Sequence, residues 1–128
     1  MSYHFSKTIN MPFDEAIEHT TSVLKENGFG VLTTIDIKAA LKEKIDVEFR
    51  PYTILGACNP GFAHKALQAE PHIGTMLPCN VIVQDAGNGK VEVSAVDPMA
   101  SMQAIENPDL GTIASQVRDM LQKVIAEI

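Results

Sequence analysis

Two short apolar segments late in the chain are joined by a turn signal, and this pairing constrains the fold more than any other feature. Residues 79–85 and 90–96 both have the composition of β-strands, and Gly87-Asn88-Gly89 lies between them. Glycine and asparagine tolerate the positive φ angles that tight hairpin turns require. We therefore expect a β-hairpin, so that at least part of the sheet is antiparallel.

Strand and helix signals alternate along the rest of the chain. Polar and apolar residues alternate over residues 3–9, which suits a strand with one buried face. Asp36 and Asn59 occupy positions typical of a helix N-cap, and Asp97-Pro98 marks the start of a further short helix. The other expected strands cover residues 29–35 and 52–58, and the other expected helices cover residues 13–24, 36–44, 62–69 and 112–126.

The last expected helix has the most regular apolar period in the chain. Its apolar stripe consists of Ile113, Val117, Met120, Leu121, Val124 and Ile125. Polar residues occupy the opposite side, so this helix should pack lengthwise across the sheet. The pair Asn107-Pro108 should break the short helix before it. These elements predict an α+β fold that forms a single domain over residues 1–128. We expect a two-layer sandwich, in which helices back a mainly antiparallel sheet of about five strands.

Length and charge limit what this domain can bind. A chain of 128 residues buries a core large enough to fold without a disulfide. The net charge of −6 argues against nucleic acid as a partner, because phosphate binding depends on an excess of basic residues. The N-terminus lacks the apolar core of a signal peptide, and no stretch approaches the roughly 20 apolar residues that span a bilayer. We expect a soluble, cytoplasmic protein with no membrane partner, whose cysteines are free thiols.

The two cysteines are the candidates for chemistry. Cys58 stands at an expected strand-to-helix junction, immediately before Asn59. The amide groups and the positive dipole end of the following helix would stabilise a thiolate there, whereas the alternative interpretation makes Cys58 a small buried core residue. Cys79 shares its strand face with Val81 and Val83, which favours a buried role.

Polar residues near the cysteines are candidate ligand-binding residues. They are Asn59, Gly61, His64, Asn80 and Arg50. His64 lies one helical turn beyond Asn59 and either faces the thiol as a base or points into solvent. Asn59 and Asn80 have a second interpretation as capping and turn residues. Arg50 belongs to a stretch of interleaved charges, which is either a solvated surface or a local anion patch.

No complete catalytic or metal-binding motif is present. Cys58, His64, His72 and Cys79 are of ligand type, but none forms a closely spaced metal-binding pair, and we expect no metal or other cofactor. A phosphate loop, a serine nucleophile elbow and a paired-histidine metal helix are all missing from the sequence. Two functions stay open: a small binding or interaction module whose ligand is anionic or apolar, and a sulfur-carrier or redox protein using Cys58 with or without Cys79. The module needs fewer additional partners, so an enzyme is less favoured.

Several short motifs carry a family resemblance. They are Arg50-Pro51-Tyr52, Leu55-Gly56-Ala57-Cys58-Asn59-Pro60, His64-Lys65-Ala66-Leu67, Ile73-Gly74, Leu77-Pro78-Cys79-Asn80-Val81 and Ala95-Val96-Asp97-Pro98. In this order they resemble the domain of unknown function 302 family over essentially the whole chain. The resemblance implies a compact α+β fold similar to the TATA-binding-protein-like group and a tendency to form homodimers. It implies no activity, although some relatives occur beside sulfur-metabolism proteins, which favours a thiol hypothesis.

Overall fold

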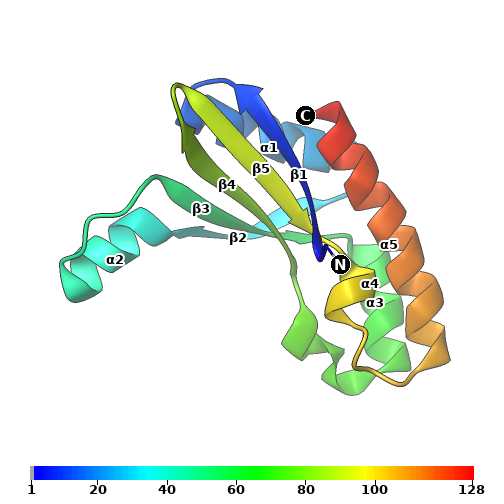
Figure 1. The fold of residues 1–128 in the computed structure, drawn as a ribbon. Coiled ribbons are helices and arrows are strands. Elements are labelled where there is room, and N and C mark those ends of the chain that lie inside the picture. Colours follow the sequence, from blue (N-terminus) through cyan, green and yellow to red (C-terminus); the bar gives the residue numbers. More distant parts are fainter. Residues whose placement is uncertain (1) are drawn as a thin grey trace.

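The computed structural model describes residues 2–128, and a five-stranded sheet forms its centre (Figure 1). In chain order the strands are β1 (His4–Asn10), β2 (Gly30–Asp36), β3 (Tyr52–Cys58), β4 (Cys79–Gly87) and β5 (Lys90–Val96). Across the sheet their order is β1-β5-β4-β3-β2, and every neighbouring pair is antiparallel. The expected α+β class is confirmed, and the first strand of the chain pairs with the last.

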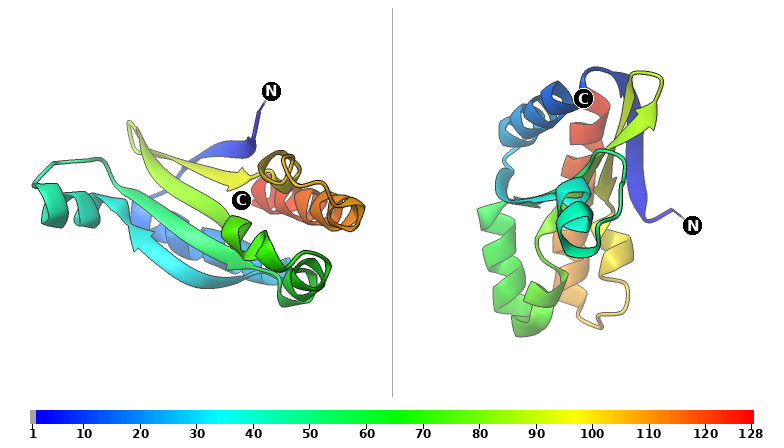
Figure 2. Two further views of the ribbon diagram at one scale, coloured as in Figure 1. Left: turned by 90° about the horizontal axis from the view of Figure 1, so that it is seen from below. Right: turned by 90° about the vertical axis from the view of Figure 1, so that its left-hand side faces the viewer.

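Helices cover one face of this sheet. They are α1 (Phe13–Glu26), α3 (Pro60–Ala69), the 3-10 helix η1 (Pro71–Met76), α4 (Pro98–Ser101) and α5 (Pro108–Glu127), whereas α2 (Ile37–Ile45) lies apart from them. Helix α1 packs on β4 and β5, α5 packs on β1 and β5, and α3 and α4 contact α5. Figure 2 shows these helices gathered on one side of the twisted sheet, with α2 set apart at the end of β2. The opposite face carries no helix within residues 2–128.

The core lies between the sheet and the helices. Alternate strand residues point to opposite faces, so Val81, Val83, Val91, Val93 and Ala95 are all buried on the helix-covered face. They pack with side chains from α5, including Val117, Leu121 and Val124. Burying one such aliphatic side chain contributes about 1.5–3 kcal/mol, so this layer supplies most of the stability that orients the site.

Helix α5 is longer than its apolar stripe predicts. It begins at Pro108, because the side chain of Asn107 accepts a hydrogen bond from the amide of Asp109 at 3.1 Å. The pair Asn107-Pro108 therefore separates α4 from α5, and Asn107 also caps α5. Pro108 is tolerated at the first helical position because the amide of that position has no partner within the helix. The extra turn places buried Leu110 against Ile73 of η1, a helix that the sequence pattern did not predict.

The hairpin between β4 and β5 has the expected turn. Gly87, Asn88 and Gly89 have φ angles of +83°, +56° and +74°. All three lie in the left-handed region, where glycine is free of strain and asparagine is tolerated. The turn sequence therefore determines the register that places alternate residues of β4 and β5 on one face.

Helix α2 and its flanking segments form a projecting arm, defined here as residues 31–50. Asp36 caps α2 by accepting a hydrogen bond from the amide of Ala39 at 2.9 Å, as its position predicts. No residue of α2 is buried, and the main contacts of the helix are with β2 and β3. In Figure 1 the arm extends away from the helices that cover the sheet.

Candidate functional site

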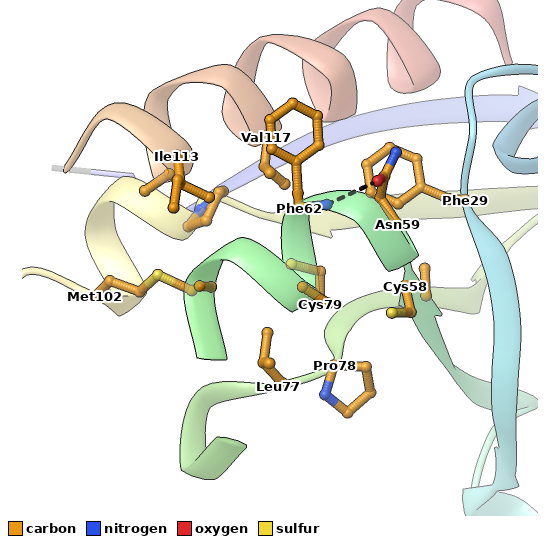
Figure 3. A pocket seen from close by; sticks show the side chains of 15 residues that line it. Phe29, Cys58, Asn59, Phe62, Leu77, Pro78, Cys79, Met102, Ile113 and Val117 are labelled. Carbon is orange, nitrogen blue, oxygen red and sulfur yellow. Dashed lines mark hydrogen bonds between the residues drawn. The ribbon is translucent and has the colours of Figure 1, made fainter. Parts of the chain in front are cut away.

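The two cysteines meet at the junction between β3, β4 and α3 (Figure 3). Cys58 ends β3, and Cys79 begins β4. Ala57 of β3 lies directly opposite Cys79 of β4, and Cys58 is the residue that follows Ala57. Both side chains line the same cleft, which neither their spacing nor their local sequence predicts.

The cleft is narrow and almost wholly apolar. Its volume is about 40 Å³. Besides the cysteines, its lining includes Phe29, Phe62, Leu77, Met102, Ile113 and Val117. Figure 3 shows that these side chains approach from several elements, with α5 above the cleft and Leu77 and Pro78 below it. An engineered apolar cavity of about 150 Å³ accepts benzene, so a cleft of this size takes only a few heavy atoms unless it widens.

Asn59 is the polar side chain of the lining, and its oxygen is already engaged. Its Oδ1 accepts a hydrogen bond from the amide of Phe62 at 3.1 Å, which caps α3. The amide of Ala63 donates to the carbonyl oxygen of Asn59 at 2.9 Å, and Pro60 has no amide hydrogen. Gly61 is exposed and lies outside the lining. The first turn of α3 therefore offers few donors to an anion inside the cleft.

The cysteines differ in exposure. Cys58 is half-buried, whereas Cys79 is buried at 9% relative exposure. Burial raises the pKa of the Cys79 thiol to about 11, and the neighbouring Cys58 adds a smaller contribution in the same direction. Cys79 therefore stays protonated at neutral pH. Any nucleophilic chemistry in this cleft depends on Cys58.

The remaining candidate residues do not join the cysteines. His64 and Gly61 belong to α3 but are exposed and do not line the cleft. Asn80 follows Cys79 directly and therefore points to the opposite face of the sheet, where it lines a second cavity. Arg50 lies beside that face, with its guanidinium donating to Gln84 Oε1. The structure thus brings together Cys58, Asn59 and Cys79, and separates the other candidates from them.

Sequence reasoning missed most of the lining. Phe29, Met102 and Ile113 come from three distant parts of the chain and reach the cleft only through packing. No local motif marks them, and their apolar character is that of ordinary core residues. In the segment 2–128, no group of three or more His, Cys, Asp or Glu side chains is placed to hold a metal ion. No helix in this part of the chain is long and apolar enough to cross a membrane.

Comparison with known proteins finds relatives of undefined activity. The family model for the domain of unknown function DUF302 matches residues 5–128. A crystal structure of an uncharacterized conserved DUF302 protein from Bacillus stearothermophilus has a TM-score of 0.90 and 28% sequence identity, with 98% of each chain covered. No curated protein matches the chain. The chain therefore belongs to the DUF302 family, a domain family of unknown function.

Proposed function

We propose that this protein is a small-ligand binding module, and that the cleft between Cys58, Phe62 and Cys79 accepts a small apolar ligand. The observation that carries the proposal is the cleft's composition, because apolar side chains from β3, α3, β4 and α5 converge on one opening. Binding sites for small molecules combine such an apolar lining with few polar groups. Here Asn59 is the polar group.

The cap geometry favours an apolar ligand over an anionic one. The amide of Phe62 donates its hydrogen to Oδ1 of Asn59, so this donor is not free for an incoming carboxylate or phosphate. A charged ligand would lose its hydration in an apolar cleft without compensating hydrogen bonds. An alkyl group of a few atoms avoids that cost and gains contact with aromatic and sulfur-containing side chains.

Titration with 1-butanol and with butyrate tests the proposal, because the two probes have equal carbon number and differ in charge. We expect 1-butanol to shift the backbone amide NMR signals of residues lining the cleft in a saturable manner. Butyrate should leave those signals unchanged. Saturable shifts with butyrate, or none with either probe, would contradict the apolar ligand.

A filling variant localises the binding. Ala63→Leu adds three carbon atoms to a half-buried residue of the lining, whereas Ala126→Leu adds the same group to an exposed position of α5. We expect Ala63→Leu to abolish the 1-butanol shifts and Ala126→Leu to preserve them. Equal binding by both variants would place the probe elsewhere.

The shared cleft also supports a second candidate function, a thiol-dependent sulfur carrier. Cys58 and Cys79 line one cleft, and only Cys58 is partly exposed. In this function the thiolate of Cys58 attacks the outer sulfur of a persulfide donor, and the donor's inner sulfur leaves as a thiolate. The buried Cys79 would then lie beside the carried sulfur without competing for it.

Two measurements separate this candidate from the binding module. A mass spectrum of protein purified without reductant should show a persulfide adduct or a disulfide if the thiols are functional. Timed labelling with iodoacetamide at neutral pH should modify Cys58 before Cys79, because nucleophilic attack requires both a thiolate and access. An unmodified dithiol, with both cysteines protected until unfolding, would reject the thiol function and leave the cleft as a binding site.

We also propose that a second copy of this chain is a partner. Four of the eight exposed large apolar side chains lie on the arm, namely Leu32, Ile35, Ile45 and Val47. Exposed apolar side chains gathered on a projecting segment are typical of a protein interface. The main contacts of α2 are with β2 and β3, so a symmetric pair of copies would cover the exposed side chains of both arms at once.

A further inference from the structure

The uncovered face of the sheet carries a continuous chain of hydrogen-bonded polar side chains. Ser94 Oγ donates to Glu92 Oε1 at 3.3 Å, and Ser6 Oγ lies 2.7 Å from Ser94 Oγ. His4 Nδ1 lies 2.7 Å from Ser6 Oγ. From the other direction, Gln84 Nε2 donates to Glu92 Oε1 at 3.4 Å. Polar groups of β4 and β5 therefore contact one oxygen of a single carboxylate, and Ser6 and His4 of β1 extend the chain from Ser94.

The hydroxyl groups of Ser94 and Ser6 link Glu92 to His4. Ser94 Oγ lies within hydrogen-bond distance of both Glu92 Oε1 and Ser6 Oγ, and Ser6 Oγ lies within hydrogen-bond distance of Nδ1 of His4. Ser94 is buried at 5% relative exposure, so the middle of this chain is closed to water. The arrangement holds the Glu92 carboxylate in one orientation before any ligand arrives.

Of these side chains, His4, Gln84, Glu92 and Ser94 line one cavity. Its volume is about 390 Å³, within the range of small-molecule sites. Apolar parts of Tyr3, Tyr52, Ile82 and Val96 form much of its lining, together with Asn80 and the polar chain around Glu92. The register sets Tyr52, Gln84 and Glu92 side by side in one row across β3, β4 and β5.

Glu92 has no cationic partner in this cavity. Within residues 2–128, no hydrogen bond reaches its Oε2 atom, and no lysine, arginine or histidine lies within ion-pair distance of it. The Arg50 guanidinium donates to Gln84 at 2.9 and 3.1 Å and lies over the rings of Phe49 and Tyr52, 4.5 and 5.5 Å from their centres. Oε2 of this half-buried carboxylate therefore has no hydrogen-bond partner among the described residues, and burying a charge without a partner costs free energy.

We propose that this cavity is a second ligand site, which binds a small organic ammonium compound. Oε2 of Glu92 accepts a hydrogen bond from the ammonium group, and the apolar part of the ligand lies against Ile82 and Tyr52. A hydrogen bond between charged groups is about twice as strong as a neutral one, and aromatic side chains attract cations. The site is separate from the cleft of Cys58 and Cys79, since it lies on the other face of the sheet.

Charge decides among the possible occupants. A carboxylate or phosphate ligand would meet the negative charge of Glu92, and the net charge of −6 on the whole chain adds to that repulsion. The same repulsion excludes a nucleic acid. A small ammonium ligand satisfies the free oxygen and fits the cavity volume.

Three probes of one shape test the proposal in the wild-type protein: 2-phenylethylammonium, 2-phenylethanol and 3-phenylpropionate. We expect the ammonium probe to shift the backbone amide signals of β4 and β5 around Gln84 and Glu92, with saturation in the millimolar range. The alcohol should bind about tenfold more weakly because it lacks the charge, and the carboxylate should not bind. Equal binding of alcohol and ammonium, or shifts confined to the cleft of Cys58, would overturn the proposal.

Two variants of equal charge change identify the acceptor. Glu92→Gln keeps the side-chain shape and should weaken binding of the ammonium probe about tenfold, whereas Glu18→Gln alters an exposed residue of α1 and should leave it unchanged. Unchanged binding by Glu92→Gln would reject the assignment. Shifts of the same amides on raising the protein concentration without probe would assign the face to a second copy of the chain instead.

Discussion

At the scale of single residues, the environment of Cys79 links its ionisation to folding. Its pKa is raised to about 11 from an ordinary value of 9.0, with burial as the main cause. Below pH 9 both the folded and the unfolded chain keep this proton, so the thiol contributes no pH dependence. As the pH rises from about 9 to about 11 the unfolded chain loses the proton and the folded chain does not, which lowers the free energy of unfolding.

We expect this effect to cost about 2 kcal/mol of stability by pH 11, since one pKa unit corresponds to about 1.4 kcal/mol and the folded thiol is itself half ionised at that pH. Urea denaturation of the wild type and of Cys79→Ala between about pH 8 and pH 11 measures it. The variant starts less stable, because it leaves a small void, but its stability should fall less steeply with pH. Parallel pH profiles would show that Cys79 is not the group responsible.

Gly56 is a residue at which no side chain fits. A Cβ atom there would collide with the hydroxyl of Thr33 and lie 2.7 Å from Cγ of Pro78. We expect Gly56→Ala to reduce the free energy of unfolding by about 2 kcal/mol, because β2 and the Pro78 ring would both have to move. Gly30→Ala, on the neighbouring strand and with no atom within 4 Å of the added carbon, serves as control and should be nearly neutral. Equal urea midpoints for the two variants would refute this account.

At the scale of elements, α5 ties the sheet to the remaining helices. Val117 lies at 8% relative exposure, in the core cluster that includes Leu121 and Val124. We expect Val117→Asp to lower the free energy of unfolding by about 3–5 kcal/mol, because it places an unpaired charge in an apolar layer. Gln116→Asp introduces the same group on the exposed side of the helix and should cost far less. A thermal midpoint for Val117→Asp close to that of the control would mean that α5 does not pack through this side.

The β4–β5 hairpin depends on backbone conformation rather than on packing at its turn. No atom lies within 4 Å of a Cβ built on Gly89, whose φ is +74°. Gly89→Val should therefore cost about 1–2 kcal/mol through backbone strain alone. Asn88→Gly, at φ +56°, retains a residue that tolerates this conformation and should change stability little. Urea denaturation compares the two, and a Gly89→Val protein as stable as the wild type would contradict the strain argument.

At the scale of the whole molecule, the arm carries four exposed large apolar side chains that other parts of the described chain do not cover. If a second copy covers them, sedimentation should give twice the mass of one chain. The double variant Ile45→Glu/Val47→Glu should then give the mass of a single chain, because it places charges on side chains that are 63% and 42% exposed within one chain. Leu67→Glu, at a 44% exposed position of α3, should stay dimeric. A single-chain mass for the wild type would refute the dimer.

Local sequence determined those parts of the fold that depend on a few neighbouring residues. The turn Gly87-Asn88-Gly89 specifies the hairpin because only certain residues adopt positive φ. Asp36 and Asn59 mark helix starts because their side chains accept amide hydrogens within three residues. The apolar period of α5 indicates its buried side before any partner is known. The alternation of side chains along a strand also places Asn80 and Cys79 on opposite faces of the sheet, because neighbouring strand residues point in opposite directions.

Tertiary structure alone decided where the sites are. The pairing of β1 with β5 joins opposite ends of the chain, and it brings Ser6 to Ser94 on the uncovered face. The cleft forms because Phe29 and Met102 approach Cys58 and Cys79 across long separations in sequence. No local signal encodes such meetings, because they arise from burying apolar surface against the whole sheet, and that energy depends on where every element packs. The sequence by itself therefore determined the elements and the sides they bury, whereas the packing of those elements decided which residues share a site.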